Sequence, residues 1–351
     1  MLRAVDANLD RLNEGLRVLE DVARFVLNDA GLSKRLRSVR HQLSQGVRPI
    51  EDTLVSRRDV RRDVEAPGRV AAGLEHRDIF ALVRANARRV EESLRVLEEF
   101  SRLSGAMPLL PAARLEHLRY QVYELDQELA AKVLRRDKTS KLAGVYLILD
   151  TDSVGGRDAS GVLDLAVRGG VRAVQLRDKR LSRAELVPLA RKLRRRCRES
   201  GVLFVVNDYV DIALAVEADG VHLGQDDLPA AEARRILPAD QVVGCTVRTV
   251  TQARRAELHG ADYVAVGSVY PTPSKAAFKL VGVEGLRRIR ESVSVPVIAI
   301  GGIGESRLAE VAVAGATGVA VISAILGADD IEAASSRLVA AFDRTASAEG
   351  E

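Results

Sequence analysis

The chain contains no tryptophan, and aromatic residues make up only 3% of its 351 residues. Because 47% of the chain is nevertheless hydrophobic, its cores must be built from Leu, Val, Ile and Ala. Only two cysteines are present, Cys197 and Cys245, which is too few for a disulfide framework or a four-ligand zinc site. This cysteine content is typical of a reducing compartment and predicts a cytoplasmic protein.

Long apolar runs are also missing. No stretch reaches the roughly 20 apolar residues of a transmembrane helix, and the opening MLRAVDANLD lacks the apolar segment of a signal peptide, so we expect neither. The net charge is only +4, and no Lys/Arg run alternates with aromatic residues, which argues against nucleic-acid binding. The length allows two domains with separate cores.

Residues 1–140 have a helical periodicity. Apolar residues recur at alternating spacings of three and four, which is typical of a helix packed on a partner helix. The first series is Leu2, Val5, Leu9, Leu12, Leu16, Leu19, Ala23 and Val26, and the second is Phe80, Val83, Ala87, Val90, Leu94 and Leu97. Further helical runs follow at about 33–55 and 110–136, and the charged segment 57–69, which ends near Pro67-Gly68, is predicted to be a loop.

The two series also share polar residues, because a shift of 78 positions aligns ten identical pairs of residues. The first copy has Ala7, Asn8, Arg11, Glu14, Leu16, Arg17, Val18, Leu19, Glu20 and Arg24, and the second has Ala85, Asn86, Arg89, Glu92, Leu94, Arg95, Val96, Leu97, Glu98 and Arg102. The pattern predicts an all-α, duplicated helical hairpin (a four-helix domain) over residues 1–138. The repeated polar residues lie off the apolar stripe, so core packing does not require them. Glu14–Arg17 and Glu20–Arg24 are equally spaced for ordinary ion pairs along a helix.

Beyond residue 143, short β-rich runs alternate with helical ones. Strands are predicted at 144–150, 172–177, 202–207, 219–223, 241–246, 262–267, 296–300 and 317–322, and helices near 160–169, 182–200, 209–217, 229–237, 249–259, 283–292, 304–314 and 329–345. Eight such units in residues 143–346 predict the α/β class and a (β/α)₈ TIM barrel. An open doubly wound sheet is the alternative, but no G-x-G-x-x-G follows the first strand. Residues 137–143 are the predicted linker.

Polar residues follow most of the predicted strands, where the active site of a TIM barrel lies. They are Gln175, Arg177 and Lys179 after the second strand, Asn207 and Asp208 after the third, Gly224 to Asp227 after the fourth, Thr246 after the fifth, and Thr272, Ser274 and Lys275 after the sixth. The cations Arg177, Lys179 and Lys275 suit a polyanion. Asp208 and Asp227 end adjacent strands and predict a Mg²⁺ ion that bridges to a diphosphate. Taken alone, Asp208 is as well explained as a cap of the following helix.

A second anion site is predicted at the last two strands. The turn GGIG (301–304) and the turn at Ile322-Ser323 lie where such barrels bind a phosphate through backbone N–H groups. No loop offers a Ser/His/Asp set, and His222, which lies inside the fourth strand, is better explained as a hydrogen-bonded core histidine than as a site residue. Two anion sites without a strong base predict ionisation of an activated diphosphate, assisted by metal and cations.

Six motifs over about residues 143–330 carry a family resemblance. In order they are QLRDK, VVND, ADGVHLGQDD, DYVAVGSVYPTPSK, PVIAIGGI and GVAVISAI. Together they resemble the thiamine-phosphate synthases. The resemblance implies a transferase of thiamine biosynthesis that joins 4-amino-2-methyl-5-(diphosphooxymethyl)pyrimidine to 4-methyl-5-(2-phosphooxyethyl)thiazole and releases diphosphate. Loss of diphosphate would leave a methylene cation that the thiazole nitrogen captures.

The resemblance also implies residue roles. The catalytic residues would be Arg177, Lys179 and Lys275, and the Mg²⁺ ligands Asp208 and Asp227. The pyrimidine diphosphate would bind to Gln175, Leu176, Arg177, Asp178, Lys179, Asn207, Thr246 and Lys275. The thiazole phosphate would bind to Thr272, Pro273, Ser274, Gly302, Ile322 and Ser323. The family usually has Ser in place of Thr246 and Thr in place of Ser274, and both changes keep the hydroxyl group. The alternative within this fold is a thiazole tautomerase, which needs no diphosphate site.

The segment DANLDRLNEGLRVLEDVARF (6–25) resembles a helical domain fused to some thiamine-phosphate synthases and described as an alternative hydroxymethylpyrimidine-phosphate kinase. The resemblance covers about residues 1–135 and implies a bifunctional enzyme with ATP as a further substrate. Asp63-Val64-Glu65 stands where that family has DVG, which is a departure from the family pattern. The residues themselves add little support for a kinase, because residues 1–140 contain no P-loop. The alternative is a non-catalytic bundle that dimerises the barrel. The sequence leaves the oligomeric state open and is compatible with a homo-oligomer.

Overall fold

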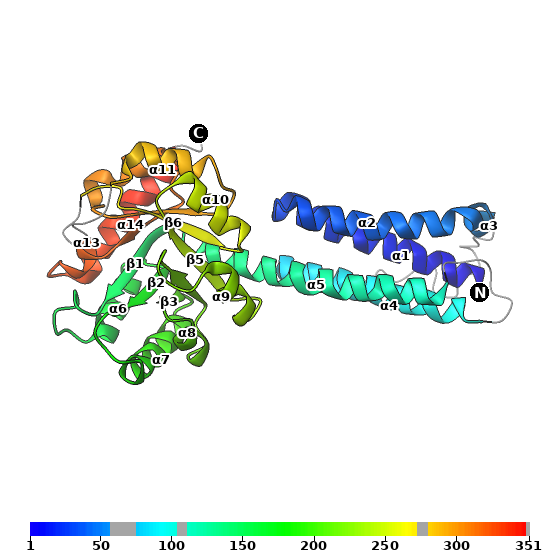
Figure 1. The fold of residues 1–351 in the computed structure, drawn as a ribbon, viewed down its shortest axis with the longest axis horizontal. Helices are drawn as coiled ribbons and strands as arrows, with labels where there is room; N and C mark the ends of the chain where they lie inside the picture. The colour runs from blue at the N-terminus through cyan, green and yellow to red at the C-terminus, as the bar shows by residue number, and fades with distance from the viewer. Residues whose placement is uncertain (57–74, 104–110, 272–279, 349–351) are drawn as a thin grey trace. The chain divides into compact units, whose positions relative to one another are not determined.

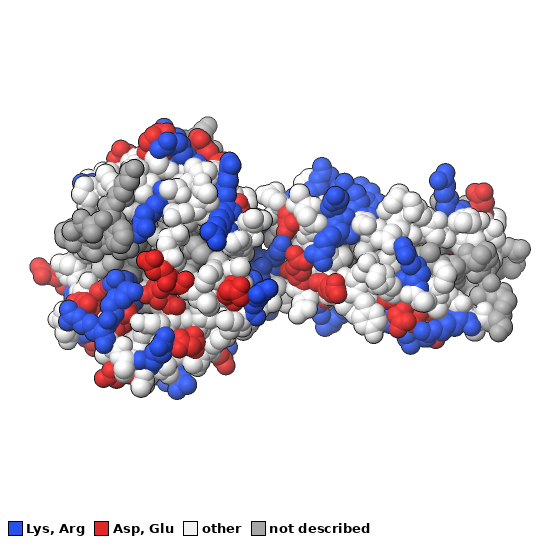
Figure 2. All heavy atoms as spheres, in the orientation of Figure 1, with Lys and Arg blue, Asp and Glu red and all other residues white. Residues whose placement is uncertain are grey.

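The computed structural model describes residues 1–56, 75–103, 111–271 and 280–348. The chain forms two compact units, Met1–Leu134 and Arg135–Glu351, which are drawn from blue to cyan and from green to red in Figure 1. The loop predicted at 57–69 lies outside the described residues. On the face shown in Figure 2, acidic and basic side chains are interspersed over both units.

The first unit is built of helices. They are α1 (Leu2–Asp21), which continues into the π-helical turn η1 (Val22–Val26), α2 (Ala30–Val47), the short η2 (Arg48–Ile50) and α3 (Glu51–Ser56), α4 (Ile79–Ser101) and α5 (Ala112–Ser140). Both predicted apolar series face one shared core, in which Leu12 and Val90 are fully buried. Gly15 lets α1 approach α4 closely, since a Cβ atom there would lie 2.7 Å from Cγ2 of Val90.

Equivalent polar residues of the two copies make equivalent contacts. The Asn8 amide donates to the Ala4 carbonyl at 2.7 Å, and the Asn86 amide donates to the Leu82 carbonyl at 2.8 Å. Each copy also buries one glutamate against an arginine of the following helix. Arg40 Nη2 lies 2.9 Å from Glu20, and Arg119 Nε lies 3.1 Å from Glu98. The duplication seen in the sequence is therefore also a duplication of side-chain contacts.

The second unit is a closed barrel of eight parallel strands in chain order, which confirms the predicted fold. The strands are β1 (Gly144–Asp150), β2 (Ala173–Arg177), β3 (Leu203–Asn207), β4 (Gly220–Leu223), β5 (Val242–Val247), β6 (Tyr263–Gly267), β7 (Val297–Ile300) and β8 (Gly318–Val321). The main helices that follow them are α6 (Ala159–Arg168), α7 (Arg183–Glu199), α8 (Val210–Ala215), α9 (Ala230–Ile236), α10 (Val250–Leu258), α11 (Gly282–Arg290), α12 (Leu308–Val313), α13 (Ser323–Leu326) and α14 (Ile331–Ala348). Every predicted strand is found within two residues of its expected bounds.

The barrel has two apolar layers because successive strand residues face opposite sides. The outer layer lies between the strands and the helices, and the inner layer fills the cylinder. Two of the few aromatic residues, Tyr146 and Tyr263, are the largest side chains of the inner layer and are fully buried. Gly244 makes room for them, since a Cβ atom at this position would lie 2.0 Å from Cζ of Tyr263.

The predicted linker at 137–143 is helical over its first four residues, because α5 continues to Ser140. Contacts within the second unit hold this last part of α5. Arg135 Nε donates to Asp262 at 2.8 Å, and Lys138 Nζ lies 2.8 Å from Asp240. The division between the units therefore falls inside a helix, earlier than composition indicated. Of the helices in the described ranges, none has the length and hydropathy needed to cross a membrane.

Gly15→Ala is expected to destabilise the α1–α4 pair by about 1–3 kcal/mol, because a methyl group there overpacks against Val90 and the Asn86 carbonyl. Gly31→Ala is the matched control, since a Cβ atom there meets only Asp29 Oδ1, at 3.4 Å. Hydrogen–deuterium exchange of peptides from α1 and α4 should accelerate in the first variant only. Equal protection in both variants would contradict the close approach.

Candidate active site

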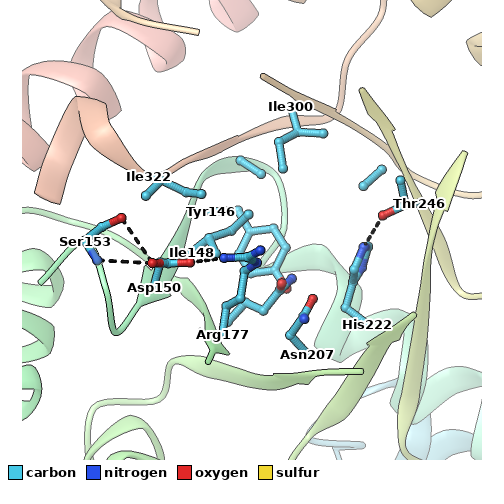
Figure 3. A pocket seen from close by; sticks show the side chains of 13 residues that line it. Tyr146, Ile148, Asp150, Ser153, Arg177, Asn207, His222, Thr246, Ile300 and Ile322 are labelled. Atoms are coloured by element: carbon cyan, nitrogen blue, oxygen red, sulfur yellow. Dashed lines mark hydrogen bonds and ion pairs between the residues drawn. The ribbon is translucent and has the colours of Figure 1, made fainter. Parts of the chain in front are cut away.

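A pocket of about 150 Å³ opens at the carboxyl ends of the barrel strands. All eight strands contribute to its lining, which consists of Tyr146, Ile148, Asp150, Ser153, Gln175, Arg177, Asn207, His222, Thr246, Ala265, Ile300, Ala320 and Ile322. Figure 3 shows Arg177 and Asn207 on one side of it and Ile300 and Ile322 on the other. The pocket therefore combines a polar rim with apolar walls.

Two ion pairs lie at this rim. Arg177 pairs with Asp150, the last residue of β1, and Lys179 pairs with Asp208, directly after β3. Asp150 is also held by Ser153, whose backbone N and Oγ both donate to it at 3.1 Å. Asp150 was not predicted from the sequence, although an acidic residue that closes the apolar run GVYLILD is the same signal as Asp208 after VVN.

Two carboxylates come together beside Lys179. Asp208 has a left-handed backbone (φ 64°), and its N–H donates to the His222 carbonyl at 2.8 Å. Asp227 Oδ2 accepts a 2.7 Å bond from the Gly224 N–H. Burial raises the pKa of Asp227, and the adjacent Asp208 raises it further. Two acidic groups so close together favour a bound cation.

The capping alternative for Asp208 is wrong. Helix α8 begins after Tyr209, and no side chain caps it. Among the described residues, no group of three or more His, Cys, Asp or Glu side chains could hold a metal. Asp208 and Asp227 alone fit Mg²⁺, which usually takes one or two protein carboxylates and completes its shell with water and substrate phosphates.

A chain of hydrogen bonds crosses the floor of the pocket. Gln175 Nε2 donates to Tyr146 Oη at 2.8 Å, and Tyr146 Oη lies 3.1 Å from Tyr263 Oη. Tyr263 Oη in turn lies 3.0 Å from His222 Nδ1, and His222 Nε2 lies 2.9 Å from Thr246 Oγ1. Burial raises the pKa of both tyrosines, so they stay neutral phenols. The tyrosines of the floor are thus uncharged, and these hydrogen bonds fix their orientation.

His222 is hydrogen-bonded through both ring nitrogens, as expected for a core histidine, and it also lines the pocket. His222 is therefore both a hydrogen-bonded core histidine and a residue of the pocket lining. What the sequence did not indicate is the pair of tyrosines on which the histidine depends. Both lie in strand runs, and the strand pattern does not reveal that their hydroxyl groups will meet.

The turns after β7 and β8 depend on backbone geometry. Gly301 and Gly302 both have positive φ angles, of 103° and 64°. A Cβ atom on Gly302 would lie 2.5 Å from the Pro271 carbonyl oxygen, so this turn has no room for another residue. Ile322 lines the pocket, and Ser323 is the first residue of α13. Four predicted residues of the sixth loop, Thr272, Pro273, Ser274 and Lys275, lie outside the described residues.

Known proteins resemble both units of the chain. A family model described as thiamine monophosphate synthase matches residues 145–325, and one described as the ThiD2 family matches residues 3–128. The chain is 38% identical to a thiamine-phosphate synthase of Synechocystis sp. over 97% of its own length and 96% of the relative's. The barrel belongs to the thiamine monophosphate synthase family.

Relatives of the barrel also occur without the helical unit. A thiamine-phosphate synthase of Moorella thermoacetica is 48% identical over 195 residues, which are 55% of this chain and 93% of the relative. The solved thiamine phosphate pyrophosphorylase of Pyrococcus furiosus matches with a TM-score of 0.54 and 38% identity, covering 59% of this chain and 98% of that one. The helical unit is therefore an addition to a barrel that forms a whole protein elsewhere in the family.

Two residues to which the family resemblance gave a role in binding do not turn their side chains to the pocket. Leu176 packs in the outer apolar layer, because it alternates with the inward-facing Gln175 and Arg177. Asp178 is buried and holds its own loop, accepting bonds from Thr151 and from the N–H groups of Arg180 and Leu181. Although burial alone would raise the pKa of Asp178, these bonds lower it.

Asp227→Asn is expected to raise the thermal midpoint of the barrel at neutral pH without added metal. The amide removes a carboxylate that burial and Asp208 disfavour, and its oxygen can still accept the bond from Gly224. A carboxyl group with a raised folded-state pKa contributes stability at low pH and loses it as the pH rises through that pKa.

The difference in thermal midpoint between Asp227→Asn and the wild type should therefore decrease as the pH falls, because the wild-type carboxyl group then takes up a proton. Thermal scans between about pH 4 and pH 8 measure this difference. A variant that is no more stable than the wild type at pH 7 would contradict the raised pKa.

Proposed function

We propose that the barrel condenses 4-amino-2-methyl-5-(diphosphooxymethyl)pyrimidine with 4-methyl-5-(2-phosphooxyethyl)thiazole, giving thiamine phosphate and diphosphate. The observation that carries this proposal is the adjacent pair Asp208 and Asp227 beside Lys179 and Arg177, above a narrow pocket with two neutral tyrosines at its floor. Family membership supports the reaction, and the named relatives are thiamine-phosphate synthases.

The floor of the pocket suits the pyrimidine ring. A flat heteroaromatic ring presents donors and acceptors at its edge and apolar faces above and below. Gln175, His222 and Thr246 offer polar atoms, while Ile148, Ile300 and Ile322 offer apolar contact. Because the tyrosines behind them are neutral and buried, the ring would bind without an ion pair, and the negative charge of the substrate would remain at the rim.

The rim suits the diphosphate. Mg²⁺ held by Asp208 and Asp227 would neutralise charge on the departing diphosphate. Lys179 and Arg177 lie at the same rim and can add charge-assisted hydrogen bonds, and Lys275 is assigned to the same anion on the strength of its motif. Each of the two cations already pairs with a carboxylate, which orients it before the substrate arrives.

The second substrate would enter over the turns after β7 and β8. We assign its phosphate to Gly302, Ile322 and Ser323, together with Thr272, Pro273 and Ser274 of the sixth loop. The Gly301–Gly302 backbone supports this assignment, since close backbone approach is what a phosphate bound by N–H groups requires. This arrangement would hold the thiazole nitrogen near the methylene carbon that loses the diphosphate.

Asp227→Ala is expected to lower the rate of thiamine phosphate formation with Mg²⁺ at least about 100-fold, because the diphosphate loses its bridging metal. Binding of thiazole phosphate, measured by calorimetry, should stay nearly unchanged. Unchanged activity of this variant with Mg²⁺ would contradict the assignment of Asp227 as a metal ligand. Isomerisation of thiazole phosphate without coupling would identify a tautomerase instead.

We further infer that the helical unit phosphorylates the pyrimidine monophosphate with ATP, supplying the diphosphate that the barrel consumes. Its match to the ThiD2 family over residues 3–128 supports this. The two thiols, Cys197 and Cys245, are buried and free, which is compatible with the reducing cytoplasm in which we expect both activities.

The full chain incubated with pyrimidine monophosphate, ATP and Mg²⁺ should form ADP and pyrimidine diphosphate in equal amounts. The Asp227→Ala variant is the matched control and should form ADP at the wild-type rate, because its change lies in the barrel. If the wild type forms no ADP, the helical unit is not a kinase. Light scattering of the full chain would then test the dimerising bundle.

A further inference from the structure

The helical unit contains a cationic pocket that the barrel reaction does not use. It lies between α1 and α2 and has a volume of about 600 Å³. Arg17, Arg37, Arg40, His41 and Ser44 line it, and Leu9, Leu43 and Val47 give it an apolar side. Glu14 is the one acidic residue among the side chains that line it. The three arginines therefore exceed the acidic charge of the lining.

The duplication supplies an internal comparison for this pocket. A shift of 79 positions aligns α2 with α5 and matches Arg35 with Arg114, Leu36 with Leu115, Arg40 with Arg119, and Gln42 with Gln121. At the two positions where α2 has the pocket residues His41 and Ser44, α5 has Tyr120 and Tyr123. The same helix face thus carries a histidine and a serine in one copy and two larger tyrosines in the other.

The tyrosines of the second copy cover its arginine. The Arg119 guanidinium lies 5.1 Å from the Tyr120 ring centre and 5.5 Å from that of Tyr123, and its Nη1 donates to Tyr123 Oη at 3.0 Å. Arg40, the equivalent residue in the first copy, faces the pocket instead. The first copy has therefore kept open a space that aromatic side chains occupy in the second.

The cations of the two copies also differ in their partners. Arg95 pairs with Glu98 at 2.9 Å and with Glu99 at 2.7 Å. Its equivalent, Arg17, forms no ion pair within the described parts of the chain, although it lines the pocket. The ordinary helix pair Glu14–Arg17 weighed from the sequence is thus not formed. Arg17 is left with its guanidinium directed at the pocket.

Arg37 and Arg40 are held in place from behind. Glu20 is almost fully buried and lies 2.7 Å from Arg37 Nε and 2.9 Å from Arg40 Nη2. Although burial alone would raise the pKa of Glu20, hydrogen bonds from Arg37 and Arg40 lower it, so the carboxylate stays ionised. Each guanidinium has five N–H donors and uses only some of them on Glu20. The remaining donors are oriented and can bind a second anion.

We propose that the pocket between α1 and α2 binds the phosphate of a reactant of the helical unit, with Arg17, Arg37 and Arg40 as its donors. The proposal rests on the kinase function inferred above and gives that function a location. Planar guanidinium groups match phosphate oxygens in pairs, and three of them on two helices suit a phosphate monoester or a polyphosphate better than a neutral ligand.

A neighbouring pocket supports a site for two reactants. It has a volume of about 450 Å³, lies between α1 and α4, and includes Arg11, Arg89 and Glu92. Glu14 lines both pockets, so they meet at this residue. A phosphoryl transfer requires donor and acceptor to lie side by side, and two pockets that share one wall provide this arrangement.

The test compares Arg17→Ala with its duplicate, Arg95→Ala, in the full chain. Arg17→Ala should lower ADP formation from pyrimidine monophosphate and Mg·ATP at least about 10-fold, because a charge-assisted phosphate contact is lost. Arg95→Ala should leave it within about twofold. Both variants should make thiamine phosphate from ready-made pyrimidine diphosphate at the wild-type rate. Equal loss in the two variants, or none in either, would overturn the proposal.

A second pair of variants exchanges the residues at these two positions between α2 and α5. His41→Tyr with Ser44→Tyr copies α5 into α2 and should abolish ADP formation by closing the pocket. Tyr120→His with Tyr123→Ser is the reciprocal control and should retain it. Normal helix content by circular dichroism and normal barrel activity would show that the variants fold. Full kinase activity in the variant with His41→Tyr and Ser44→Tyr would contradict a phosphate site between α1 and α2.

Equilibrium dialysis identifies which reactant the pocket takes and separates this proposal from the kinase function. Mg·ATP and pyrimidine monophosphate are the two probes, and the difference between wild type and Arg17→Ala excludes binding to the barrel. Weaker binding of either probe by Arg17→Ala, with Arg95→Ala unaffected, supports the site and names its occupant. If the wild type forms no ADP, the difference in binding between wild type and Arg17→Ala still tests the phosphate site. If the two proteins bind both probes equally, the site is overturned.

Discussion

Closure of the barrel is the constraint on which the proposed active site depends. Because β8 pairs with β1, with Gly144 opposite Gly318, the eight parallel strands form a ring and all their carboxyl ends lie at one rim. Asp150, Arg177, Asn207 and Thr246 are far apart in the chain, yet they line one pocket. Each of them contributes one side chain to a surface that no single loop could build.

Charge at this rim is balanced before any substrate is present. Asp150 pairs with Arg177 and Asp208 pairs with Lys179, while burial and the neighbouring Asp208 raise the pKa of Asp227. The arrangement leaves a demand for one more cation, which Mg²⁺ can meet. Beneath it, the hydrogen-bonded line from Gln175 to Thr246 contains two neutral tyrosines, whereas the charged side chains lie at the rim.

In the helical unit, comparison of the two copies distinguishes contacts that both copies make from contacts that only one makes. Glu20 with Arg40 and Glu98 with Arg119 are equivalent pairs, and each satisfies a buried carboxylate. Such pairs are explained by stability alone, since a buried charge requires a partner. Arg17 and Arg95 are identical in type and differ in environment. Only Arg95 takes part in an ion-pair network in the described structure.

The sequence by itself determined the elements, because apolar periodicity and strand-end motifs depend only on local spacing. It predicted eight strands to within two residues, the duplicated helices, and the pairing of Asp208 with Asp227 at one rim. Tertiary structure alone decided the partners. Tyr146 and Tyr263 meet through their hydroxyl groups, and Asp150 pairs with Arg177 on the neighbouring strand. These contacts join residues distant in the chain, and no local pattern records which side chain will face which.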